Sequence, residues 1–144
     1  MGIVAAVNRG LFGADQGGPG PGGSDSTAEL AIPLDTDWVD VGLYCYLGDE
    51  FVIEVSGRGW LDDTPGSQIG PDGLMTGDDA ETRVLPDAGT GSVIGKLKTT
   101  PEVFPIGTGT TYECPAQGDL MLGINDTDLD DNSGEFAAFV TLNQ

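Results

Sequence analysis

The stretch that decides the fold is "WVDVGLYCYLGDEFVIEVSGRGW", residues 38–60. Two apolar runs flank a Leu-Gly-Asp turn at residues 47–49. In the second run Phe51, Ile53 and Val55 alternate with Val52, Glu54 and Ser56. Alternation with a period of two is typical of a strand that buries one face. The stretch therefore predicts two β-strands joined by a turn.

The same alternation recurs toward the C-terminus, in "GDLMLGI" at residues 118–124 and "EFAAFVTL" at residues 135–142. Two more candidate strand regions are "SVIGKLK" at 92–98 and "EVFPIGTGTTYECPA" at 102–116. No window repeats apolar residues at the spacing of a long helix. Many of the 24 glycines separate short apolar runs, as in turns between strands. We therefore expect an all-β fold of about eight short strands, a β-sandwich or jelly roll.

The length of 144 residues fits one domain with a core of ordinary size. We expect the β-sandwich to occupy residues 28–144, preceded by an arm and linker at residues 1–27. The arm, "MGIVAAVNRGLFG", is too short to span a bilayer and lacks the basic start of a good signal peptide. A Gly/Pro-rich linker, "ADQGGPGPGGSDST", follows it.

The arm has two interpretations: a disordered start, or a segment that docks on a partner. We favour docking, with residues 1–24 contacting other subunits of a protein assembly. The apolar side chains expected to make this contact are Ile3, Val4, Val7, Leu11 and Phe12. This interpretation predicts an oligomer.

The charge balance is extreme, with 24 acidic residues, 5 basic residues, no histidine and a formal net charge of −19. Nucleic-acid binding needs clustered Lys and Arg, and an anionic membrane surface would repel this chain. We expect neither nucleic-acid binding nor membrane insertion. The lack of histidine removes Ser–His and Cys–His catalysis and histidine metal sites, so we expect no enzyme. The acidity suits a halophilic source, where salt screens self-repulsion; a mesophilic acidic surface protein is the alternative.

Two cysteines, Cys45 and Cys114, permit one disulfide but do not require it. Both lie in apolar or strand-like surroundings, where a free cysteine often packs as a small buried hydrophobe. We therefore favour two free thiols over a bridge.

The acidic stretch "INDTDLDDNSGEF", residues 124–136, is the main candidate site. An EF-hand loop starting at Asp126 would need Gly at position six and Glu at position twelve, where this chain has Asp131 and Ala137. An EF-hand is therefore rejected. Calcium also binds outside EF-hands, because it accepts six to eight oxygens in flexible geometry. The alternative is a solvated acidic turn.

Several stretches resemble the PA-I type (LecA-like) calcium-dependent lectins, whose fold is a galactose-binding-like β-sandwich. The matching stretches are residues 38–60, "GPDG" at 70–73, "GSVIGKL" at 91–97, "FPIGTGTTYECPAQGDLMLGIND" at 104–126 and "DNSGEF" at 131–136. They follow the order of the family from about residue 36 to the C-terminus, while the arm and linker lie outside. The most specific element is the "IND…DNSG" pair.

The resemblance implies a calcium ion in the loop at 126–132, coordinated also by sugar hydroxyls. The implied calcium ligands are Asp126, Asp131 and Asn132, with Asp128 and Asp63 as further candidates. The candidate carbohydrate contacts are Trp60, whose ring could stack on a sugar, and the acids Asp62 and Asp126.

The loop at 74–90, "LMTGDDAETRVLPDAGT", lacks the histidine and glutamine with which the lectin grips galactose, so galactose specificity is not expected. Trp60 is also open to plain packing, which is commoner for tryptophan at a strand end. A catalytic pair of Asp62 and Asp63, as in glycoside hydrolysis, is rejected because no hydrolase motif accompanies it.

Two functions remain. The first is a non-enzymatic module of an extracellular or virion surface assembly, such as a decoration, turret or tail subunit, with a calcium-dependent adhesion fold. The second is a free-standing calcium-dependent lectin for a glycan other than galactose. Both predict a location outside the cell or on the virion surface, reached without a classical signal peptide.

Overall fold

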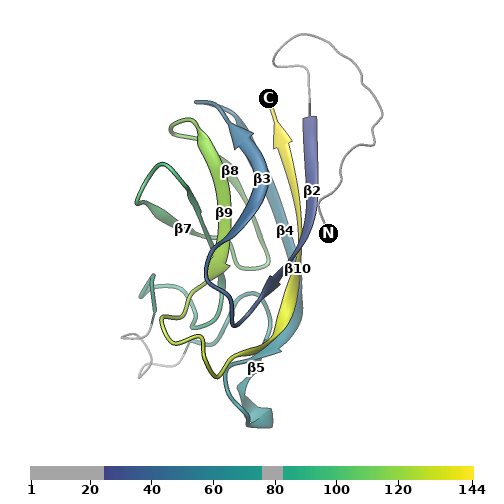
Figure 1. Ribbon diagram of the computed structural model, residues 1–144, viewed down its shortest axis with the longest axis vertical. Coiled ribbons are helices and arrows are strands. Elements are labelled where there is room, and N and C mark those ends of the chain that lie inside the picture. The colour runs from purple at the N-terminus through teal and green to yellow at the C-terminus, as the bar shows by residue number, and fades with distance from the viewer. Residues whose placement is uncertain (1–24, 76–82) are drawn as a thin grey trace.

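The computed structural model describes residues 25–75 and 83–144, so the predicted arm at residues 1–24 lies outside the described residues. The described chain forms two antiparallel sheets that lie face to face (Figure 1). It contains no α-helix in these ranges, and hence none long and apolar enough to cross a membrane. The predicted all-β sandwich is confirmed.

The first sheet has the strand order β2-β10-β4-β5, and β8 also pairs with β4. Its strands are β2 (Asp25–Pro33), β10 (Ser133–Asn143), β4 (Glu50–Trp60), β5 (Gln68–Ile69) and β8 (Gly109–Glu113). β2 begins three residues before the expected start of the body at residue 28, because its pairing with β10 extends to the pair Asp25 and Asn143.

The second sheet has the strand order β3-β9-β6-β7. Its strands are β3 (Val39–Cys45), β9 (Gly118–Ile124), β6 (Val93–Leu97) and β7 (Val103–Pro105). The predicted turn after β3 is present, and the amide of Asp49 donates to the carbonyl of Tyr46 at 3.0 Å. This turn leads from one sheet to the other, since β3 and β4 pair with different neighbours.

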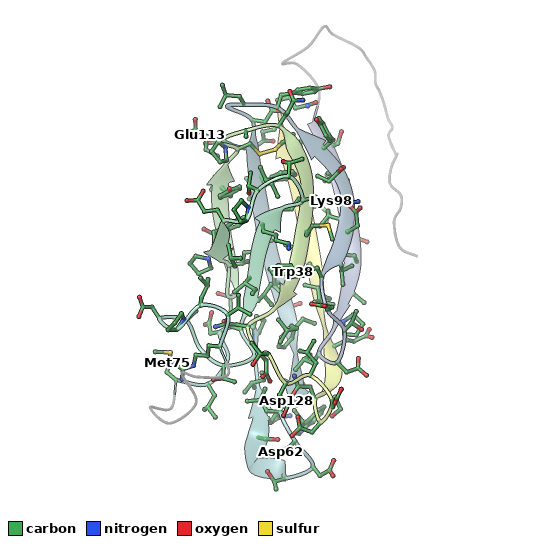
Figure 2. The ribbon with its side chains drawn as sticks, turned by 60° about the vertical axis from the view of Figure 1, so that its left-hand side comes forward. Trp38, Asp62, Met75, Lys98, Glu113 and Asp128 are labelled. Carbon is green, nitrogen blue, oxygen red and sulfur yellow. A yellow bond between two sulfur atoms is a disulfide. The ribbon has the colours of Figure 1, made fainter. Side chains whose placement is uncertain are left out.

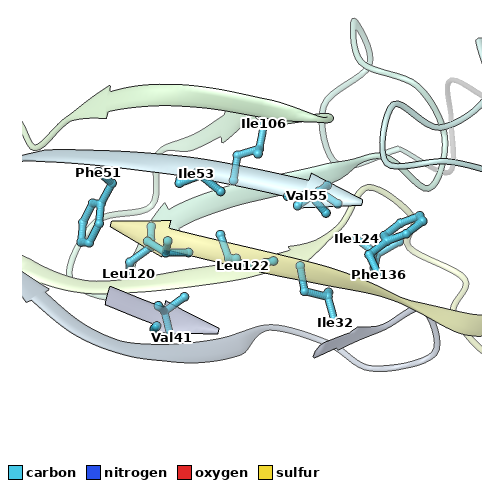
Figure 3. Packing of buried hydrophobic residues seen from close by; sticks show 14 of the residues in the cluster. Ile32, Val41, Phe51, Ile53, Val55, Ile106, Leu120, Leu122, Ile124 and Phe136 are labelled. Atoms are coloured by element: carbon cyan, nitrogen blue, oxygen red, sulfur yellow. The ribbon is translucent and has the colours of Figure 1, made fainter. Parts of the chain in front are cut away.

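The core lies between the sheets and is built from the alternating faces that the sequence predicts (Figure 3). The predicted inward residues are all buried: Phe51, Ile53, Val55, Leu120, Leu122, Ile124, Phe136, Ala138, Val140 and Leu142. Burying each large apolar side chain contributes about 1.5–3 kcal/mol. The loops at the ends of the sandwich therefore rest on a stable scaffold.

Cys45 and Cys114 form a disulfide, which corrects the prediction of two free thiols. Cys45 ends β3 in one sheet and Cys114 follows β8 in the other, with the two Cα atoms 6.5 Å apart. The 69-residue separation hid this proximity, because only the packing of the two sheets brings the strand ends together.

The long polar segment after β4 is only partly regular. It contains a 3-10 turn, η2 (Pro65–Ser67), then β5, and an isolated bridge between Leu74 and Thr90. Within it, residues 76–82 lie outside the described residues. Together with the β9–β10 connection, this segment builds one end of the sandwich.

Candidate functional site

The acidic loop and the loop after Trp60 lie at the same end of the sandwich. Figure 2 places Asp128 and Asp62 together at that end, far from Glu113, which lies beside the disulfide end. The sheet geometry causes this, because β4 and β10 pair along their full length and Trp60 lies opposite Ser133. The loop that follows β4 and the loop that precedes β10 must therefore meet.

Asp126 is the buried acid of this end, with only 8% of its surface exposed. Its Oδ1 accepts a hydrogen bond from the amide of Asp128 at 2.9 Å, and its Oδ2 accepts one from Nδ2 of Asn132 at 3.1 Å. Burial raises the pKa of Asp126, and the charges of Asp128 and Asp131 add to this, although the two hydrogen bonds oppose it. The protein therefore holds this carboxylate at a cost that a bound cation would offset.

Asn132 is buried as well, with 6% of its surface exposed. Its Nδ2 donates to Oδ2 of Asp126 and also to the carbonyl of Leu34, both at 3.1 Å. Its Oδ1 is buried and has no hydrogen-bond partner in the described part of the chain. An unsatisfied buried amide oxygen costs about 1–3 kcal/mol. A ligand or a water molecule bound at this oxygen would remove that cost.

A cavity of about 330 Å³ opens beside this pair. Asp62, Asp126, Asp128 and Asp131 all line it. Three predicted calcium ligands and the predicted sugar contact Asp62 therefore share one hollow. Four carboxylates around one hollow give it a negative potential.

A second hollow, of about 350 Å³, lies next to the first, and Asp62 and Thr64 line both. Its other walls include Trp60, Asp63 and Ser133. Trp60 is half-buried and presents part of its ring there. The predicted carbohydrate contacts Trp60 and Asp62 are thus neighbours, while Asp63 lines the hollow of Trp60 and not that of Asp126.

The loop of Asp62 is ordered by its own side chains. Oδ1 of Asp62 accepts hydrogen bonds from the hydroxyl and the amide of Thr64, which lower the pKa of Asp62, and the nearby Ser67 hydroxyl lowers it further. Oγ of Ser67 donates to the carbonyl of Thr64 at 2.8 Å. Asp62 is therefore an exposed, ionised carboxylate held in one place.

The predicted calcium ligands do not form a closed carboxylate cage. Within residues 25–75 and 83–144, no three or more Asp, Glu, Cys or His side chains are grouped so that they could hold one metal ion. Asp128 and Asp131 are exposed and turn toward the cavity, and Asp63 lies in the adjacent hollow. Asp126 and Asn132 are the two buried members of the predicted ligand set, and they are hydrogen-bonded to each other.

Asn125 is a residue of the site that sequence reasoning missed. It is fully buried and clamps the segment at 85–89. Its Oδ1 accepts from the amide of Leu85 at 2.7 Å, and its Nδ2 donates to the carbonyls of Leu85 at 2.9 Å and Gly89 at 3.0 Å. The available signal was an amide placed between an apolar strand and Asp126, where a capping role is common.

Trp38 is not part of the site. Figure 2 shows it midway along the molecule, away from Asp62 and Asp128. Its ring lies against Gly123, where an added Cβ would come within 2.7 Å of it, and Nζ of Lys96 lies 4.6 Å from the ring centre. Packing and a cation–π contact explain this tryptophan.

The fold is that of a known lectin domain. A solved structure described as "EclA N-terminal domain; PllA-like lectin" superposes with a TM-score of 0.64, covering 79% of this chain and 94% of that one. The two sequences are 20% identical, so the likeness concerns the β-sandwich fold. No protein-family model and no curated protein sequence matches the chain.

Proposed function

We propose that this protein is a carbohydrate-binding module that binds a glycan through calcium at the Asp126 end of the sandwich. The observation that carries the proposal is the Asp126–Asn132 pair, a buried carboxylate next to a buried amide oxygen without a partner. Asp126 lines the cavity between the acidic loops at one end of a lectin-like fold, and Asn132 is hydrogen-bonded to it.

The residues present suit calcium because they offer oxygen atoms as ligands. Asp126 and Asn132 offer side-chain oxygens, and backbone carbonyls of residues 127–130 and 62–63 would complete part of a shell of six to eight oxygens. Calcium, when bound, supplies open positions for sugar hydroxyls. Asp128 and Asp131 would add negative potential around the ion.

The sugar would extend from the ion toward the hollow of Trp60. The exposed part of its ring suits the apolar face of a pyranose, and the ionised Asp62 between the two hollows suits its hydroxyls. Asp63 also lines this hollow and would be a further contact. Galactose is not the proposed sugar, because the predicted loop at 74–90 lacks the side chains that would select it.

The first experiment measures the melting temperature of the full chain in high monovalent salt, with calcium and then with chelator. At about 1,000 times the dissociation constant, calcium would add roughly 4 kcal/mol of stability. For a domain of this length that is a rise of order 10 °C. The rise should disappear in Asp126→Ala and persist in Asp37→Ala, an exposed aspartate outside both hollows. No rise in the wild type would overturn the calcium part of the proposal.

A glycan array with the calcium-loaded protein then tests the sugar part. Trp60→Ala should abolish binding to the best glycan while leaving the calcium-dependent rise in melting temperature in place. Binding that survives both Trp60→Ala and Asp62→Ala would move the sugar site elsewhere.

A second proposal concerns assembly. Residues 1–24 carry only Arg9 and Asp15, so the net charge of −19 falls on the rest of the chain. A neutral, apolar segment ahead of an acidic domain favours a surface subunit, extracellular or on a virion, that contacts its neighbours through residues 1–24. Deleting these residues should abolish incorporation into the assembly and leave glycan binding unchanged.

A further inference from the structure

The outer face of the first sheet carries a large open depression that the proposed function does not use. It measures about 920 Å³ and lies over β2, β10 and β4, on the side of the sheet opposite to the core. We call it the Phe139 cup and define it by Glu29, Glu54, Ala31, Ala137 and Phe139, all of which line it.

The register of the sheet explains the shape of the cup. On β10, Phe139 pairs with Glu29 of β2 on one side and with Glu54 of β4 on the other. Two residues along, Ala137 pairs with Ala31 and with Ser56. A row of small side chains therefore forms a floor beside a row of three large ones.

The cup carries the kinds of group that bind a cation, an exposed aromatic ring and two carboxylates. Phe139 is 40% exposed, although its neighbours on β10, Ala138 and Val140, belong to the core. Neighbouring strands lie about 4.8 Å apart, so Glu29 and Glu54 flank the ring at roughly 10 Å from each other. Within the described part of the chain, neither carboxylate has a hydrogen-bond or ion-pair partner. An aromatic face between two carboxylates suits a guanidinium, which stacks on the ring and donates to both acids.

We propose that the occupant of the cup is the segment "VNRGLF", residues 7–12 of the same chain, with the guanidinium of Arg9 over Phe139. Arg9 is the only basic side chain of residues 1–24, and the rest of the chain carries the whole net negative charge. Leu11 and Phe12 supply apolar side chains for the floor formed by Ala31 and Ala137.

The length of chain makes this contact accessible. β2 begins at Asp25, and Glu29 lies four residues further along the strand, about 13 Å at the usual rise per residue. Sixteen residue steps separate Arg9 from Asp25, so this length of chain spans at most about 54 Å, several times the distance to Glu29. A covalent tether raises the effective concentration of Arg9 at the cup, which favours a contact that would be weak between separate molecules.

The test is a comparison of NMR spectra of the full chain, wild type against Arg9→Ala, at low protein concentration and moderate salt. The ring resonances of Phe139 and the backbone amides of Glu29 and Glu54 should shift in Arg9→Ala. Asp15→Ala, a charge change in the same segment, should leave these resonances where they are. Arg9→Lys should retain part of the wild-type shift, and molar salt should reduce it.

Two results would overturn the proposal. The first is identical resonances at Phe139, Glu29 and Glu54 in the wild type and Arg9→Ala. The second is a difference that appears only at high protein concentration, which would assign the contact to another copy. Because Glu29→Gln combined with Glu54→Gln changes exposed side chains, it should fold, and it should make the shift insensitive to Arg9→Ala. Glu113→Gln, an exposed acid of the same sheet outside the cup, is the matched control.

Discussion

The two ends of the sandwich differ in what lies at them: a disulfide at one end and a buried carboxylate among other acids at the other. At the disulfide end, Oδ2 of Asp49 accepts hydrogen bonds from the amide of Tyr46 at 2.8 Å and from Nε2 of Gln144 at 3.2 Å. The amide of Cys114 donates to the carbonyl of Asp49 at 2.7 Å. At the other end, Oδ1 of Asn132 is buried without a partner and Asp126 is a buried carboxylate among like charges.

In our proposal, the first end stabilises the fold and the second end binds the ligand. The disulfide and the hydrogen bonds of Asp49 hold the first end together, and the buried hydroxyl of Thr100 there has no partner in the described part of the chain. The second end keeps polar groups that cost free energy unless a ligand meets them. Proteins commonly depart from full polar satisfaction at functional sites, and the departure here lies where the lectin-like fold brings its loops together.

The largest expected effect on stability comes from removing the disulfide at the first end. The double variant Cys45→Ser, Cys114→Ser should lose about 4 kcal/mol of unfolding free energy, because a disulfide that closes a loop of this length restricts the unfolded chain strongly. Denaturant titration measures the loss, and reducing the wild type should reproduce it.

If the two ends are independent, the response of this variant to calcium and chelator should match that of the wild type. A loss below about 1 kcal/mol would contradict the stabilising role given to the disulfide end.

A smaller loss of unfolding free energy is expected when Asn125, which clamps residues 85–89 at the second end, is replaced. Asn125→Ala should cost about 3 kcal/mol, since the buried amide and carbonyl groups at Leu85 and Gly89 lose their partners. Asn143→Ala, a half-buried asparagine at the opposite end, should change stability by no more than about 0.5 kcal/mol. Equal losses in the two variants, measured by thermal unfolding, would show that Asn125 has no special role.

The smallest expected effect is on how the stability of the fold depends on pH. The pKa of Asp126 is raised above its ordinary value of 3.8, so the folded state holds the proton more tightly than the unfolded state. Ionisation of Asp126 therefore lowers stability as pH rises from 3.8 through the folded pKa, and the cost is complete above it. Without calcium, Asp126→Asn should become more stable relative to the wild type as the pH rises through this range. With calcium at neutral pH, the wild type should be the more stable of the two.

Asp62 supplies the opposite case for comparison. Its hydrogen bonds from Thr64 lower its pKa, so its contribution is present above the ordinary value of 3.8 and is lost as pH falls through the folded pKa. Asp62→Asn should therefore lose stability relative to the wild type as pH rises. Denaturant titrations across pH that give the same sign for both variants would contradict this account.

The fold was predictable because its information is local. Alternation at Phe51, Ile53 and Val55 and along β10 identifies strands and their buried faces without any knowledge of their partners. The acidic loop was also identified, as was the proximity of Asp62 to Asp126 through the family resemblance. The clamp by Asn125 was missed, because its partners at 85–89 lie about forty positions away and no local pattern connects them.

The sequence by itself determined the strand content, the inward faces and the acidity of the loops, because each follows from residue type and short-range spacing. Only the tertiary structure decided that Cys45 meets Cys114 and that Trp60 stands beside Ser133. It alone decided that the amide oxygen of Asn132 is buried without a partner. The physical reason is that burial and pairing across sheets depend on which strands become neighbours, and residues far apart along the chain choose those neighbours together.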